Sequence, residues 1–67
     1  MPKLTLKAAR INAGYTQDRA AKELGVSVSS IQNWELNRIS PRLKEYIKMC
    51  KLYSVSLDDI DFFSDGD

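Results

Sequence analysis

Apolar positions in this 67-residue chain recur every three to four residues, the period of helices that bury one side. A first helix is predicted between Thr5, a candidate N-cap, and Gly14, which ends the run. Its inner side carries Leu6, Ala9 and Ala13. At about two and a half turns the helix is short, so it depends on packing against the rest of the chain.

A second predicted helix stops after Leu24, and a third begins after Ser27. Thr16 is the N-cap candidate of the second, and Asp18 lies in its first turn, where the helix dipole favours a negative charge. Its inner side carries Ala20, Ala21 and Leu24. Gly25 supplies the left-handed conformation that closes a helix. The turn from Gly25 to Ser27 is short enough to fix the angle between the two helices.

The third predicted helix runs from about Val28 to Leu36 and has two chemically different sides. Ile31 and Trp34 form its buried side. The opposite side is a polar, uncharged arc of roughly 140° at about 100° per residue. This arc consists of Val28, Ser29, Gln32 and Asn33.

A fourth helix is predicted to start at Ser40-Pro41, as a cap followed by proline at the first helical position. Its apolar stripe carries Leu43, Tyr46, Ile47, Cys50 and Tyr53. Ser56 can cap a fifth, short helix with Leu57 and Ile60, with Asp58 and Asp59 in its first turn. The pattern predicts one all-α domain over residues 1–63, followed at 64–67 by an acidic tail or the start of a linker.

The amino-acid composition limits the kinds of site and the class of protein that we expect. The single Cys50 excludes an internal disulfide, and with no histidine in the chain we expect no metal site and no cofactor. No apolar stretch approaches the roughly 18 residues of a membrane span, so we expect a cytoplasmic protein. An enzyme is not expected, because no nucleophile has a partner base and the cluster of Asp58, Asp59 and Asp61 is explained by a helix start.

The small net charge hides a strong asymmetry. Residues 1–53 hold all ten Lys and Arg against four acids, which gives +6, whereas residues 54–67 hold five Asp and no base. A basic body favours a polyanionic partner, although such surfaces also serve solubility.

Two short helices joined by a three-residue turn form a helix-turn-helix, whose second helix can lie in the major groove of DNA. The run "TQDRAAKELGVSVSSIQNWE" and the later "YSVSLDDI" resemble the lambda-repressor-like family, also called the Cro/C1 or XRE type. The matching positions are Thr16-Gln17, Ala21, Leu24 to Ser27, Ile31, Trp34-Glu35 and Val55 to Asp58. The resemblance covers about residues 4 to 62 and implies a compact five-helix DNA-binding domain.

The resemblance also implies a function. It is that of a sequence-specific regulator of transcription, a phage or bacterial repressor or Cro-like protein that binds double-stranded operator DNA and takes no small-molecule substrate. Relatives bind as two-fold homodimers on half-sites roughly 34 Å apart. A dimer surface is expected around Leu57 to Phe63, unless Phe62 and Phe63 simply close the core.

Roles follow for individual residues. The arc of Val28, Ser29, Gln32 and Asn33 is expected to meet base edges, with an A·T-leaning half-site because the arc has no Arg or Lys. Phosphate contacts are expected from Gln17, Ser27, Asn37, Arg38 and Arg42. The alternatives are that Ser27 only caps its helix and that Arg38 is only solvated.

Arg10 and Glu35 correspond to positions that form an ion pair in relatives; two unrelated surface charges are the alternative. The chain also departs from the family. Ala20 replaces a usual Leu, so Tyr15 or Trp34 is expected to fill the space. Asn37 and Ser54 replace usual glycines, and Arg19 replaces a common Glu.

An interaction module of the same fold, such as an antitoxin that contacts a protein through the Asp-rich tail, is the alternative function. The outer arc of the third helix separates the two hypotheses, because an interaction-only domain has no need to keep it polar and open.

Overall fold

Thr5, Thr16 and Ser27 begin the first three helices in the same way, as the sequence predicted. The Thr5 hydroxyl accepts a hydrogen bond from the Ala8 N–H at 3.0 Å, and each of the other two accepts one from the amide three residues on, at 3.1 Å. Each bond satisfies a first-turn N–H that has no partner inside the helix. The polar residue before each apolar run therefore sets the start of the helix.

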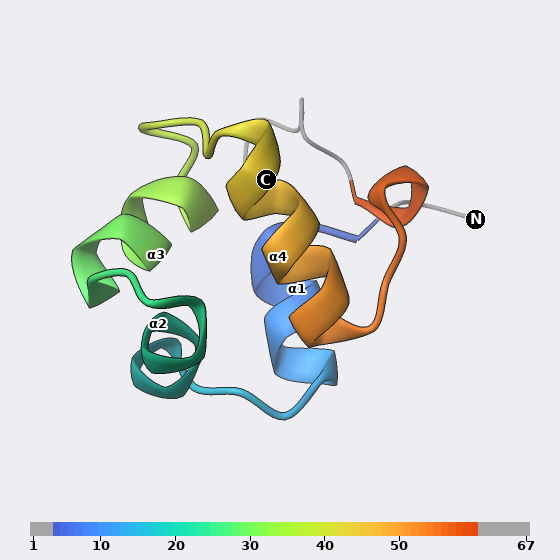
Figure 1. The fold of residues 1–67 in the computed structure, drawn as a ribbon, viewed down its shortest axis with the longest axis horizontal. Coiled ribbons are helices and arrows are strands. Elements are labelled where there is room, and N and C mark those ends of the chain that lie inside the picture. The colour runs from blue at the N-terminus through green and yellow to red at the C-terminus, as the bar shows by residue number, and fades with distance from the viewer. Residues whose placement is uncertain (1–3, 61–67) are drawn as a thin grey trace.

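The computed structural model describes residues 4–60, and within them four α-helices surround one core (Figure 1). The helices are α1 (Leu6–Asn12), α2 (Gln17–Leu24), α3 (Val28–Glu35) and α4 (Leu43–Tyr53), followed by a 3-10 turn, η1 (Leu57–Asp59). The all-α class is thus confirmed. In Figure 1, α2 and α3 lie together on one side of the molecule, and α1 and α4 lie on the other.

The turn between α2 and α3 has the predicted backbone. Gly25 adopts φ 72° and ψ 32°, the left-handed conformation that glycine reaches without steric cost. The Val26 N–H then bonds back to the Ala21 carbonyl at 3.0 Å, which closes the end of α2. Ala21 is only 3% exposed, and its small side chain lets α2 pack closely in the core.

The core is made of ten buried residues drawn from all four helices and from the end of the described chain. They are Leu6, Ala9, Ala20, Ala21, Ile31, Trp34, Met49, Cys50, Tyr53 and Ile60. Tyr15, which is half-buried, packs against this cluster, and its ring centroid lies 6.1 Å from that of Tyr53. The two aromatic residues expected near the small Ala20 therefore lie in the core or against it.

The predicted start of α4 was wrong. Arg42 is the N-cap residue and Leu43 the first helical residue, whereas Ser40 and Pro41 precede the helix. The Glu45 carboxylate accepts a hydrogen bond from the Arg42 N–H at 3.0 Å, so an acidic residue in the first turn sets the start. Pro41 is buried ahead of the helix instead of opening it.

The inner side of α4 also differs from the predicted stripe. Leu43 is 67% exposed and Ile47 38%, whereas Met49 is buried together with Cys50 and Tyr53. The helix packs against α1 and α2 along the face centred on these three residues, which turns Leu43 and Ile47 towards solvent. The apolar period was correct for an α-helix, and Tyr46 of the predicted stripe is half-buried and packs against the core, but the buried face is turned towards Met49.

The segment predicted as a fifth helix forms only the 3-10 turn η1. It ends because Ile60 adopts an extended backbone (φ −103°, ψ 133°) and pairs with Leu4 in a parallel bridge. The Leu4 N–H donates to the Asp59 carbonyl at 2.8 Å, and Ile60 is 1% exposed. Phe62, Phe63 and the predicted tail at 64–67 lie outside the described residues.

Candidate functional site

The outer side of α3 reaches the surface while its inner side is clamped in the core. Ile31 and Trp34 are 1% and 8% exposed. On the predicted arc, Ser29 and Gln32 are exposed, and Val28 and Asn33 are half-buried. Since Val28 also packs against the core, the most accessible part of the arc is its polar part.

The loop after α3 is fastened to the end of the helix. The Asn33 carbonyl accepts the N–H of Arg38 at 2.9 Å and that of Ile39 at 3.4 Å. Asn37 adopts φ 60°, the left-handed region that Asn tolerates better than most residues. The loop therefore has a defined path, and Arg38 projects into solvent beside the end of the arc.

Arg10 and Glu35 form an ion pair that joins α1 to α3. Arg10 Nε lies 2.7 Å from Glu35 Oε2, and Nη2 lies 3.3 Å from Oε1, which makes the contact bidentate. Arg10 Nη1 also donates to the Tyr15 carbonyl at 2.8 Å. Arg10 is the one charged residue in the buried class within residues 4–60, and the guanidinium spans α1, the α1–α2 turn and α3.

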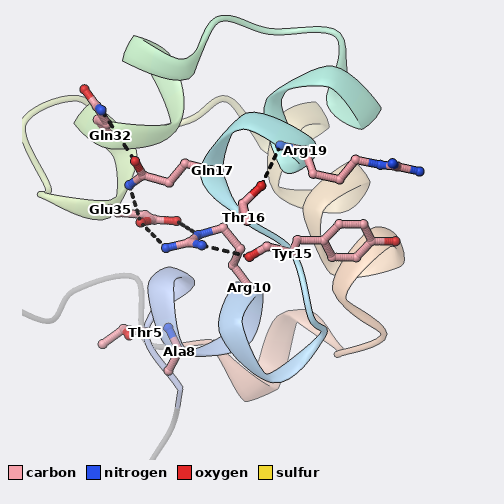
Figure 2. Close-up of polar contacts among 9 residues, drawn as sticks. All are labelled: Thr5, Ala8, Arg10, Tyr15, Thr16, Gln17, Arg19, Gln32 and Glu35. Atoms are coloured by element: carbon pink, nitrogen blue, oxygen red, sulfur yellow. Dashed lines mark hydrogen bonds and ion pairs between the residues drawn. The ribbon is translucent and has the colours of Figure 1, made fainter.

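Gln17 extends this pair to the outer arc, as Figure 2 shows. Gln17 Nε2 donates to Glu35 Oε1 at 3.1 Å, and Gln32 Nε2 donates to Gln17 Oε1 at 3.4 Å. The hydrogen bonds thus run without a break from the buried Arg10 to the exposed Gln32. No buried side-chain nitrogen or oxygen of the described chain lacks a partner.

The buried charges affect a neighbouring tyrosine. The pKa of Tyr53 is raised from 10.0 to about 12, first by burial and then by the negative charge of Glu35. The positive charge of Arg10 opposes this rise. Burial and the nearby Asp59 also raise the pKa of the Cys50 thiol, so this cysteine stays protonated and behaves as a small apolar residue.

The residues predicted to bind phosphate do not share one environment. Ser27, Asn37, Arg38 and Arg42 are exposed, before α3, in the loop after it and at the start of α4. The Ser27 hydroxyl caps α3 and lies 3.0 Å from the Ser30 hydroxyl. Gln17 differs from the other four, because its amide is bonded to Glu35 and Gln32.

Lys7 is a residue that the sequence reasoning missed. It is exposed on α1 and lines two open hollows, of about 550 and 370 Å³, that it shares with Gln17 and Gln32. The available signal was its position one turn before Arg10 on the same helix. Lys7 therefore adds a cation beside Gln32 of the outer arc.

Residues 4–60 hold no group of three or more His, Cys, Asp or Glu placed to bind a metal ion. Within this range no helix has the length and apolar character needed to cross a bilayer.

Comparisons with known proteins agree with this geometry. A family model described as helix-turn-helix matches residues 6–60. The HTH-type transcriptional regulator ImmR of Bacillus subtilis is 40% identical over 53 residues, which are 79% of this chain and 42% of ImmR. The uncharacterized HTH-type transcriptional regulator MJ0272 of Methanocaldococcus jannaschii is 36% identical over 62 residues, 92% of this chain and 94% of that protein. No solved structure matches significantly.

Proposed function

We propose that this chain, which belongs to the helix-turn-helix family, is a transcriptional regulator that binds double-stranded DNA sequence-specifically through the outer side of α3. One observation carries the proposal. The exposed side of α3 is short, polar and uncharged, while Ile31 and Trp34 hold the other side in the core. No charged side chain has to lose its water when this surface binds, and its polar groups can pair with the hydrogen-bond donors and acceptors of base edges.

The shape of the site suits the major groove. That groove is about 12 Å wide and admits one α-helix. The amides of Gln32 and Asn33 can each donate one hydrogen bond and accept another. Adenine presents one acceptor and one donor in the major groove, so either amide can meet both. We propose that Val28 contacts a thymine methyl group and that Ser29 bonds either kind of edge. The half-site we propose is therefore A·T-leaning.

Phosphate binding is proposed for groups around α3, all of them exposed except the half-buried Gln17. Arg38 and Arg42 supply charge after the end of the helix, and Lys7 supplies it on the α1 side. Ser27, Asn37 and Gln17 supply neutral hydrogen-bonding groups. Contacts of this kind set register and orientation on the duplex, and base contacts set the sequence.

We further propose that two copies bind a two-fold operator and act as a repressor or Cro-like regulator in the cytoplasm. One such small domain contacts too few base pairs for useful specificity, and half-sites one helical turn apart let a pair of domains read one face of the duplex. Of the surface expected to pair the copies, Leu57 is 37% exposed. The relatives named above carry the description of HTH-type transcriptional regulators.

The direct test is selection of duplexes from a random pool. We expect enrichment of a two-fold symmetric site with A·T-rich half-sites about one DNA turn apart, roughly 34 Å. Enrichment of an asymmetric single site would contradict the proposed dimer but would still agree with DNA binding through α3. A pool that stays unenriched at low salt would reject sequence-specific DNA binding.

Alanine variants of Gln32 and Asn33 test which face binds. Each should weaken binding to the selected site by about 1–3 kcal/mol, because a bidentate base contact is lost. Asn12→Ala, at an exposed position at the end of α1, is the matched control and should bind like the wild type. Thermal unfolding of all three checks the fold, and site-specific binding that survives both α3 substitutions would mean that another face is used.

A further inference from the structure

The amide of Gln32 is the last member of the hydrogen-bonded chain that begins at Arg10 (Figure 2). Gln17 stands between them, bonded to Glu35 on one side and to Gln32 on the other. Gln17 and Gln32 are 15 residues apart, on α2 and α3. The contact therefore crosses the helix-turn-helix itself.

The direction of these bonds follows from the charges. A guanidinium can only donate hydrogen bonds, and an ionised carboxylate can only accept them. With Arg10 on its inner side, Glu35 still accepts, so Gln17 must turn its NH₂ group towards Glu35 and its carbonyl oxygen outward. Gln32 in turn must present its NH₂ group to that oxygen. The buried ion pair thus sets the orientation of both amides.

The remaining groups of Gln32 suit a base edge. One amide hydrogen is bonded to Gln17, which leaves the carbonyl oxygen and the second hydrogen without a partner among the described residues. Adenine offers one acceptor and one donor in the major groove, and a glutamine amide meets both at once. An amide fixed in advance also loses less rotational freedom when it binds.

We infer that Gln17 is a positioning residue that holds the Gln32 amide in the orientation needed to read a base, before DNA is bound. This inference rests on the proposed function and deepens it, since it assigns Gln17 a part in sequence preference besides a contact to phosphate. Lys7, beside both glutamines, neither donates to nor accepts from this chain of bonds in the structure.

A double-mutant cycle tests the inference. Gln32→Ala first identifies the base pair whose preference is lost. Gln17→Met keeps the length of the side chain without the amide, and it should weaken the preference at that same base pair by about 3- to 10-fold. In the double variant that combines Gln17→Met with Gln32→Ala, that preference should be no weaker than in Gln32→Ala alone. Lys22→Met, on the exposed part of α2, is the matched control and should leave the preference unchanged.

Other results would contradict the inference or the proposed function. If Gln17→Met lowers affinity equally for every sequence and adds fully to Gln32→Ala, Gln17 only contacts phosphate. If Gln32→Ala changes the preference at no base pair, there is no reading residue for Gln17 to position. A wild-type protein that selects no duplex rejects the proposed function as a whole, whereas selection with an additive cycle rejects this inference alone.

A second measurement needs no DNA. In the free protein, ¹⁵N relaxation of the Gln32 side-chain amide should show restricted motion. Gln17→Met should release this amide while the protein stays folded, which its thermal unfolding curve checks. Lys22→Met should leave the amide restricted. Equal mobility of the Gln32 amide in the wild type and in Gln17→Met would overturn the inference.

Discussion

Arg10 Nε lies 2.7 Å from Glu35 Oε2, and the two residues are 25 positions apart in the chain. Their side chains are only 8% and 6% exposed. A pair this buried gains strong attraction but pays for desolvation, so its net contribution is modest when both partners are present. Its geometric effect is definite, because it ties the end of α3, next to the surface that we propose reads bases, to α1.

Removing one partner of this pair should lower the free energy of unfolding far more than the intact pair raises it. Glu35→Ala leaves the Arg10 guanidinium buried with only the Tyr15 carbonyl, and we expect it to lower the free energy of unfolding by about 3–5 kcal/mol. Urea unfolding followed by Trp34 fluorescence measures this. The matched control is Glu23→Ala, which breaks the exposed Arg19–Glu23 pair and should cost under about 1 kcal/mol. Equal costs for the two variants would contradict the assigned role of burial.

Binding to DNA should depend steeply on salt. With about five phosphates neutralised per subunit, log affinity should fall against log salt with a slope near −4 to −5 per subunit. Arg38→Ala should make the slope less steep by about 1 and weaken all sequences alike. Lys51→Ala, in the last turn of α4 beside Glu23, is the control and should leave the slope unchanged. A flat response of the wild type to salt would be incompatible with the proposed phosphate contacts.

Ser54 should be a site of easy stabilisation. It ends α4 with φ 58° and ψ 43°, a conformation that strains residues with a Cβ atom. Ser54→Gly removes this strain but adds freedom to the unfolded chain, so we expect a net gain of about 0.5–1 kcal/mol. Ser54→Ala keeps the Cβ atom and serves as the control without a gain. Thermal unfolding of both variants decides, and a loss of stability in the glycine variant would refute the expected strain.

Stability should fall in strong alkali because of Tyr53. Its pKa is raised from 10.0 to about 12, so the folded protein holds the phenol proton more tightly than the unfolded chain. The stabilising contribution is complete below about pH 10 and is lost between pH 10 and 12, on the order of 1–2 kcal/mol. Tyr53→Phe has no such proton, and its stability should fall less over this interval. Parallel curves for the two proteins would contradict the raised pKa.

Much of the fold could be predicted because its signals are local. A hydroxyl before an apolar run and a glycine after it specify the limits of α2 within a few neighbouring residues. The start of α4 could not be predicted in this way, since Ser40-Pro41 and Arg42 with Glu45 are competing starts and packing chooses between them. The 3-10 turn was missed for a similar reason. Ile60 leaves the helical path to pair with Leu4, at the other end of the domain.

The candidate site, too, could be predicted from the sequence only where its features are local. Helical periodicity predicts the outer arc of α3. Ser29 and Gln32 are exposed there, whereas Val28 and Asn33 are half-buried, so the sequence predicted the side of the helix but not the accessibility of each residue. The place of Gln17 could not be found by periodicity. Its partners Glu35 and Gln32 lie on another helix, and only the folded angle between α2 and α3 brings the three side chains together.

The bridge between Leu4 and Ile60 bears on how the domain can be cut. The two residues close the ring of helices where the described chain begins and ends, and the buried Ile60 depends on that closure. Trimming the chain inside either residue would remove this bridge and uncover the Ile60 side chain. Truncations, fusions and tags should therefore leave both residues in place.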